Sequence, residues 1–277
     1  MAATATTALP ETRATSESEV PLWRLYVLRA TYLLLIVGLG ATIVPQLFDH
    51  GPTDRGVIPG LLSGMWVLAF LGLRYPLQML PLLLFEFLWK TVWLLDFGLP
   101  QRLSGRVPPT FAEDFPAITF GVILMPLVIP WGYVWRHYVK ARPDGVEPGA
   151  SRARLNVIRG AFILMFIPGL MIVPPLIFAH DPMNRGVFAS FLIALFLLSF
   201  LVIRYPLKML PVLMLELVWK AIWLFSFGLP QWLAGVGSPK LSEDIWAVGL
   251  GPVFFGLLIP WGYVWRHYVQ QPAERWR

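Results

Sequence analysis

The sequence predicts an all-α integral membrane protein with eight transmembrane helices, arranged as two four-helix repeats in tandem. Composition is the first reason. Of the 277 residues, 57% are hydrophobic and 14% are charged, whereas a soluble domain carries roughly 25% charged residues. Several uncharged apolar runs approach the ~20 residues that cross a hydrocarbon core about 30 Å thick. Thirteen tryptophans and eight tyrosines also suit this class, because their amphipathic rings favour the headgroup region.

The second reason is an internal repeat with a period of 130 residues and no gap. The stretch "RYPLQMLPLLLFEFLWKTVWLLDFGLPQ" (74–101) aligns with "RYPLKMLPVLMLELVWKAIWLFSFGLPQ" (204–231). The stretch "IPWGYVWRHYV" occurs unchanged at 129–139 and at 259–269. A period this long describes a bundle of helices rather than one unit of a solenoid. We therefore interpret the chain as the duplication and fusion of a four-helix ancestor.

Each repeat contains four apolar segments that we expect to be helices. A tight turn at 74–76 joins the second and third segments, because proline disfavours helix in the residue before it. Pro126, Pro130 and Pro260 are expected to bend the fourth and eighth segments. The expected helices are 25–47, 57–73, 77–97 and 115–135 in the first repeat (21–139), and 155–177, 187–203, 207–227 and 245–265 in the second (155–269).

Three polar stretches lie outside the repeats. Residues 1–20 are rich in Ala, Thr and Ser and lack the apolar core of a signal peptide, so we expect a disordered tail that stays on the protein. Residues 140–154 are polar and rich in helix breakers, which predicts a cytoplasmic linker. Residues 270–277 form a C-terminal tail.

The distribution of Lys and Arg orients the predicted helices. With the N-terminus in the cytoplasm, fifteen Lys and Arg residues fall on the inner side and five on the outer side, which satisfies the positive-inside rule. Both termini are then cytoplasmic, and a bacterial-type inner membrane is expected. Four helices per repeat is an even number, so the pseudo-twofold axis should lie along the membrane normal. This topology accounts for the net charge of +6 without a nucleic-acid partner.

A glutamate and a lysine lie inside the third segment of each repeat. Glu86 and Lys90, like Glu216 and Lys220, are four residues apart with the acid first, the favourable order on one helix face. Ionisable residues inside a membrane are costly and mark functional sites by default. We therefore expect the passage of a small solute or ion, with proton coupling through the two glutamates.

A structural interpretation of the same four residues stands beside this one. Each pair can serve as a neutral internal ion pair that fixes how its helix packs, or the lysine can extend toward the interface. On that interpretation the protein is a non-catalytic assembly or lipid-organising protein. The spacing of the glutamates and lysines is equally compatible with the transport interpretation and the structural interpretation.

Other recurring residues point to the membrane surface. Arg136, His137, Arg266 and His267 follow an aromatic run where a helix leaves the membrane, which is typical of an interface anchor; the alternative is a patch for anionic lipid headgroups. Arg74 and Arg204 mark the inner turns, and Arg74 is also a candidate contact for an acidic lipid. A third function, membrane electron transfer, would use haem held by the four histidines His50, His137, His180 and His267.

The sequence lacks the residues that several classes of chemistry require. Cysteine is absent, which removes thiolate nucleophiles and cysteine-bound metals. The sequence contains no phosphate-binding glycine loop, HExxH helix or nucleophile–base arrangement. We therefore predict no metal site and no bound cofactor, and we lean against an enzyme; the expected partners are the lipid bilayer and a small solute or ion.

Overall fold

The structure is a computed structural model that describes residues 19–179, 181 and 183–276. Most of the predicted tail 1–20, and also His180, lie outside the described residues. Within the described residues the regular structure is helical, and the one strand-like feature is an antiparallel bridge between Glu147 and Ala150.

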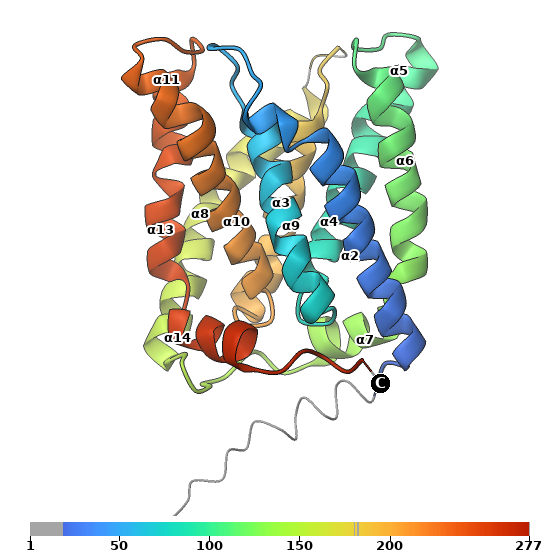
Figure 1. Ribbon diagram of the computed structural model, residues 1–277, viewed down its shortest axis with the longest axis vertical. Helices are drawn as coiled ribbons and strands as arrows, with labels where there is room; N and C mark the ends of the chain where they lie inside the picture. Colours follow the sequence, from blue (N-terminus) through green and yellow to red (C-terminus); the bar gives the residue numbers. More distant parts are fainter. Residues whose placement is uncertain (1–18, 180, 182, 277) are drawn as a thin grey trace, which may run out of the picture.

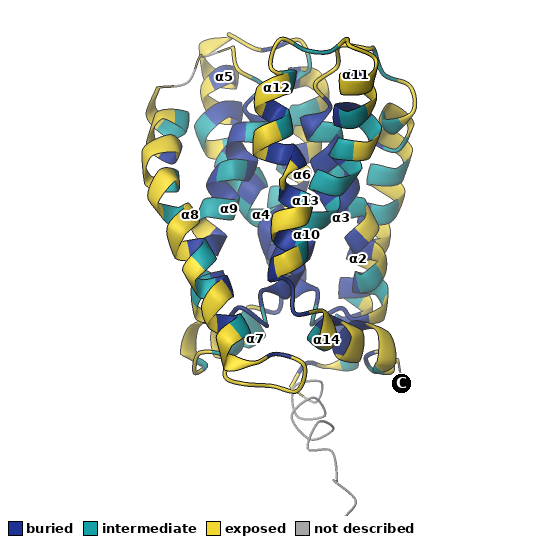
Figure 2. Cartoon of the chain, turned by 90° about the vertical axis from the view of Figure 1, so that its left-hand side faces the viewer, coloured by how far each residue is buried: buried dark blue, intermediate teal, exposed yellow. Residues whose placement is uncertain are grey.

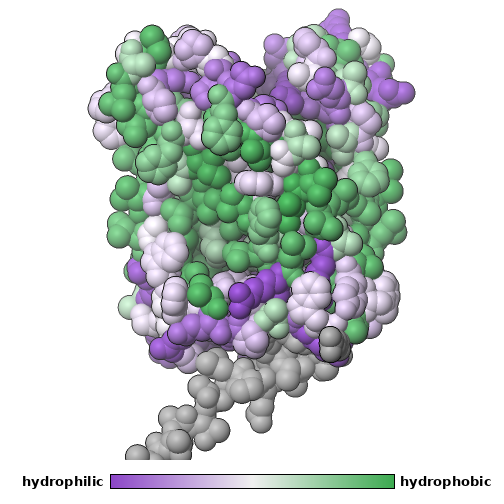
Figure 3. Space-filling view, viewed as in Figure 1, coloured by the Kyte–Doolittle hydropathy of each residue, from purple (hydrophilic) through white to green (hydrophobic). Residues whose placement is uncertain are grey.

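The long helices stand side by side and form a bundle with loops at both ends (Figure 1). Seven of them are long and apolar enough to cross a membrane, which agrees with the predicted helical, multi-pass membrane protein. A broad apolar belt surrounds the middle of the face shown in Figure 3, with polar residues above and below it. The seven are α2(Leu22–Thr42), α3(Val57–Arg74), α6(Phe111–Val128), α8(Arg152–Phe178), α9(Val187–Arg204), and the continuous stretches Leu210–Leu233 and Leu241–Leu258.

The third segment of each predicted repeat is longer than the sequence indicated. Helix α4(Leu80–Trp93) continues through the π-helical turn η2(Leu94–Gly98) into α5(Leu99–Ser104). The stretch expected to be a loop after residue 97 is therefore helical at first. The backbone allows this because Gly98 keeps helical angles and the wider π-helical turn η2 comes directly before the proline of α5. The second half has the same order, α10(Leu210–Trp223), η4(Leu224–Gly228) and α11(Leu229–Leu233).

The fourth and eighth segments end earlier than predicted. Helix α6 stops at Val128, because Ile129 precedes Pro130 and takes extended angles. The eighth segment, α12(Leu241–Asp244), η5(Ile245–Gly249) and α13(Gly251–Leu258), stops in the same way before Pro260. The prolines at 130 and 260 therefore end these helices instead of bending them. The repeated motif that follows forms short helices along the base of the bundle, α7(Trp131–Val134) with η3(Trp135–Lys140), and α14(Trp261–Val264) with η6(Trp265–Gln270) (Figure 1).

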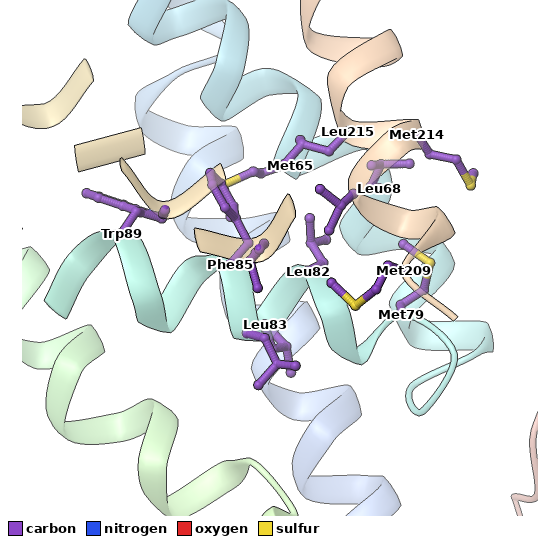
Figure 4. Close-up of a cluster of buried hydrophobic side chains, with 14 of the residues drawn as sticks. Met65, Leu68, Met79, Leu82, Leu83, Phe85, Trp89, Met209, Met214 and Leu215 are labelled. Atoms are coloured by element: carbon purple, nitrogen blue, oxygen red, sulfur yellow. The ribbon is translucent and has the colours of Figure 1, made fainter. Parts of the chain in front are cut away.

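The two halves pack on each other through an apolar core. Helix α10 lies against α3 of the other half, and α4 lies against α9. Close to this contact, Met65 lies beside Leu215 and Phe85, and Leu82 lies near Leu68 (Figure 4). Gly64 permits the close approach of α3 and α10, since a Cβ there would lie 2.6 Å from the Cβ of Trp219. The centre of the molecule is therefore filled with apolar side chains.

At the base, the chain segment after each half docks on the other half. The Asp144 carboxylate accepts backbone N–H groups of Leu207 and Lys208, at 2.8 and 3.0 Å. The Glu274 carboxylate accepts those of Leu77 and Gln78 at 2.9 and 3.1 Å. Each carboxylate thus lies just before the N-terminus of a central helix, α10 or α4, where negative charge is favourable. The start of the predicted linker is therefore a packed part of the fold.

Candidate functional site

The first charged pair is buried and satisfied within its own helix. Glu86 is 2% exposed, and its carboxylate lies 2.7 Å from the Lys90 ammonium. Its second oxygen accepts the indole N–H of Trp89 at 2.6 Å. The Lys90 ammonium also lies 5.5 Å from the Trp89 ring centre. One turn of α4 therefore supplies both partners of the ion pair and an additional donor.

The second pair repeats this arrangement on α10. Glu216 is 5% exposed and lies 2.6 Å from the Lys220 ammonium. The Trp219 indole donates to its other oxygen at 3.2 Å. Lys220 lies against two aromatic rings, with its ammonium 5.1 Å from the centre of Trp219 and 4.7 Å from that of Phe255. The pair is neutral as a unit, which is how a charge is tolerated in an apolar interior.

A glycine on the neighbouring outer helix makes room for each lysine. A Cβ on Gly121 of α6 would lie 2.5 Å from the Lys90 Cδ atom, and one on Gly251 of α13 would lie 2.1 Å from the Lys220 Cδ atom. These two glycines are 130 residues apart, so their recurrence at the sequence period could have marked them as neighbours of the lysines. Sequence reasoning missed them because the pairing of helices α4 with α6 and α10 with α13 was unknown.

The structure does not bring the two charged pairs together. Lys90 contacts α6 and Lys220 contacts α13, and these helices stand on opposite sides of the bundle (Figure 1). The apolar core of Figure 4 lies between the halves. The two charged pairs therefore lie in separate environments and do not line a common polar path.

The second pair borders a cavity of about 380 Å³. Glu216, Trp219, Lys220 and Ser199 contribute its polar groups, and the remainder is apolar and rich in phenylalanine. The wall formed by α8 includes Pro168 and Gly169, and the Phe196 ring packs against Gly169, where a Cβ would lie 2.5 Å from the ring. A mostly apolar cavity of this size with a few converging polar groups is typical of a small-molecule site.

At the position in the first half that corresponds to Phe196, the side chain is the larger indole of Trp66. Trp66 stands 130 residues before Phe196, a residue that lines the cavity. Its indole N–H donates to the carbonyl oxygen of Ile36 at 3.0 Å, which ties α3 to α2. Gly40 accommodates the ring, since a Cβ there would lie 2.9 Å from the Trp66 nitrogen. The two pairs are thus chemically alike but differ in their surroundings.

Two further ion pairs join the halves at the end of the bundle opposite the base. Arg55 binds Asp244 through two hydrogen bonds of 2.6 Å each, and Arg185 binds Asp114 through bonds of 2.7 and 2.8 Å. The hydrogen bonds to their aspartates raise the pKa of both arginines. Each half supplies the arginine of one bridge and the aspartate of the other. Sequence reasoning missed them, although all four residues recur at the 130-residue period.

The predicted basic and aromatic residues lie along the base, and most of the basic side chains contact other segments of the chain. Arg74 donates to the carbonyl oxygen of Gln271 at 3.0 Å, and Arg204 to that of Ala141 at 3.3 Å. They therefore hold the docked segments in place. Arg136 lies 3.2 Å from the Glu19 carboxylate, and Arg266 is exposed.

The histidines of the repeated motif stack on tyrosines one turn earlier. The ring centres of His137 and Tyr133 are 3.8 Å apart, and those of His267 and Tyr263 are 3.7 Å apart. His50 lies at the other end of the molecule, with Nε2 3.1 Å from the carbonyl oxygen of Ser226. His180 is outside the described residues, so haem ligation stays a prediction. No group of three or more metal-ligating side chains occurs among the residues that were placed.

The stacked position of His137 gives an expected pH dependence. Burial is the main cause that lowers the pKa of His137 below its ordinary value. The neutral ring therefore stabilises the fold above about pH 6.5, the ordinary value, and this contribution is lost as the pH falls below it. We expect thermal stability to fall on acidification from about pH 7.5 to about 5.5, and to fall less in His137→Gln. An equal loss in both proteins would contradict this assignment.

Comparison with known proteins gives no relative on which to base a function. No protein-family model, no curated protein and no solved structure matches the chain.

Proposed function

We propose that the chain crosses the membrane eight times, with the continuous helix Leu80–Ser104 as the additional span. This helix has 25 residues, or about 37 Å at 1.5 Å per residue. Of the four charged residues of this helix, Glu86 and Lys90 neutralise each other, which lowers the cost of burying them.

The proposal includes two repeats in one orientation, with their base toward the cytoplasm. It is supported by contacts that recur with exchanged halves, such as Arg55–Asp244 with Arg185–Asp114. The start of α2 and the C-terminal segment share one end, since the Tyr26 hydroxyl donates to the carbonyl oxygen of Trp276.

Single cysteines test this topology, and the chain contains none of its own. Arg74→Cys and Ser104→Cys place an exposed thiol at the two ends of the proposed span. A membrane-impermeant maleimide should label Ser104→Cys in intact cells, and Arg74→Cys only after permeabilisation. Labelling of both thiols from one side would remove the eighth span, and the reverse pattern would invert the orientation.

For the function itself, we propose that the protein binds a small solute beside Glu216 and Lys220 and passes it through the membrane. The observation that carries the proposal is the cavity that reaches this buried pair. The Glu86–Lys90 pair, packed against α6, has a supporting structural role.

The two halves provide a matched pair of variants to test binding. Glu216→Gln with Lys220→Met removes the charges at the cavity, and Glu86→Gln with Lys90→Met makes the same change in the first half. Native mass spectrometry of the purified full-length protein measures a retained small molecule. We expect wild type and the first-half variant to retain it and the second-half variant to lose it. Equal retention in all three, or none in wild type, would refute the proposal.

A further inference from the structure

The walls of the cavity determine how a molecule reaches the Glu216–Lys220 pair. The lining residues lie in helices α8, α9, α10 and α13 and in the turn η5, and none lies in an end loop. Helix α8 is the least covered of the seven candidate spans, with 11% of its most apolar stretch buried, and Figure 2 shows it at the edge of the bundle with much of its length exposed. Ile172 lines the cavity yet is 53% exposed. The cavity therefore opens sideways, through the apolar belt.

The charge of the site restricts what it can bind. Glu216 and Lys220 neutralise each other at 2.6 Å, and the other lining side chains are uncharged. A ligand with a net charge would bring an uncompensated charge into this apolar space, which is unfavourable. A neutral ligand meets no such penalty.

The remaining hydrogen-bonding capacity indicates the polar group of the ligand. An ammonium has three donors and no acceptor. Among the described residues, Lys220 gives one of them to Glu216 and otherwise faces the rings of Trp219 and Phe255. Two donors are left for a hydroxyl or carbonyl oxygen. The Phe166 and Phe196 rings, stacked with centres 4.5 Å apart, line the part of the cavity suited to an apolar body.

We infer that the ligand is a neutral amphiphile, with a hydroxyl or carbonyl head and an apolar body, which enters from the lipid side between α8 and its neighbours. The inference rests on the proposed function, because it names the ligand class of the same cavity. The head accepts a hydrogen bond from Lys220, and the body lies among the phenylalanines. In the first half, the residue that corresponds to Phe196 is the larger Trp66, whose ring is held against α2 by its hydrogen bond to Ile36.

Photo-crosslinking in membranes tests the inference with three defined probes of equal chain length. They are a diazirine-bearing monoacylglycerol, which is neutral, the corresponding fatty acid, which is anionic, and the corresponding alkyl-trimethylammonium, which is cationic. Labelled residues are mapped by mass spectrometry on the full-length protein. We expect the neutral probe to label cavity residues 162–173 and 192–199 about tenfold more than the charged probes do.

Two tryptophan variants on α8 serve as a matched pair. Ile172→Trp obstructs the mouth of the cavity, whereas Met171→Trp adds the same ring at an adjacent position that is 76% exposed and does not line it. Cavity labelling should be lost in the first variant and kept in the second. Loss in both, or in neither, would overturn entry from the lipid side.

The outcomes separate this inference from the proposed function. Preferential labelling of the cavity by a charged probe would overturn the neutral ligand class and leave solute binding intact. Labelling of the cavity no stronger than that of outward-facing α8 residues, by every probe, would overturn the inference as a whole. The retained-molecule measurement on the charge-pair variants decides the proposed function independently, because it does not depend on the probe or on the route of entry.

Discussion

Lys90→Met is expected to destabilise the protein by about 3–5 kcal/mol, the usual cost of removing one partner from a buried ion pair. Glu86 is 2% exposed, and Lys90 is its ion-pair partner at 2.7 Å. Without the lysine, the carboxylate keeps only the Trp89 indole N–H and must either stay charged in an apolar surrounding or take up a proton. Both alternatives cost free energy of folding, and Gly121, the α6 residue that lies against Lys90, has no side chain that could replace the ammonium.

The double variant Glu86→Gln with Lys90→Met is the control. It removes both charges and keeps the shape, so most of the stability should return. Thermal unfolding in detergent, followed by tryptophan fluorescence, measures the effect. At ~2–4 °C per kcal/mol, the single variant should lose on the order of 10 °C. A single variant as stable as wild type would show that the pair contributes nothing to folding.

Gly64→Ala is expected to produce the second large effect, through the contact between the halves. A Cβ at this position would lie 2.6 Å from the Trp219 Cβ and 2.9 Å from its Cα. Backbone atoms cannot rotate away as a side-chain tip can, so α3 and α10 must separate. Overpacking of this kind costs typically about 1–3 kcal/mol, and this contact belongs at the upper end because the obstructing atoms include backbone.

Gly38→Ala is the matched control for that variant. Gly38 lies inside α2 with no atom within 4 Å of a Cβ placed there. Alanine favours helix over glycine by up to about 1 kcal/mol, so this variant should be as stable as wild type or slightly more stable. The measurement is the apparent melting temperature of Gly64→Ala compared with that of Gly38→Ala. A Gly64→Ala protein that matches Gly38→Ala would mean that α3 and α10 are less closely packed than described.

The ion pairs at the end opposite the base and the docked basal segments have a common consequence. Arg55–Asp244 and Arg185–Asp114 hold the halves together at one end, and Asp144 and Glu274 hold them at the other. Any motion that separates the halves must break contacts at one of these ends. A ligand that enters through the side of the second half requires no such motion, which is consistent with the lateral route inferred above.

Helix content could be derived from the sequence because it depends on local properties. Uncharged apolar runs of sufficient length form helices in a bilayer, where every backbone polar group must be satisfied within the segment. The ends of these helices were derived less well. The helix through Ser104 and the breaks before Pro130 and Pro260 depend on backbone angles at single glycines and prolines, which the hydropathy of a segment does not report.

By itself, the sequence determined that the chain is helical and apolar enough for a membrane, and that Glu86 and Lys90, like Glu216 and Lys220, share a helix face. These features follow from composition and from spacing along one helix. The tertiary structure alone decided which helices face each pair, that an apolar core separates the two pairs, and that only Glu216 and Lys220 line the described cavity beside α8. The physical reason is that burial and open space arise where different helices meet, and side chains as distant as Trp66 and Ile36, or Lys220 and Gly251, fill or leave that space only after the chain has folded.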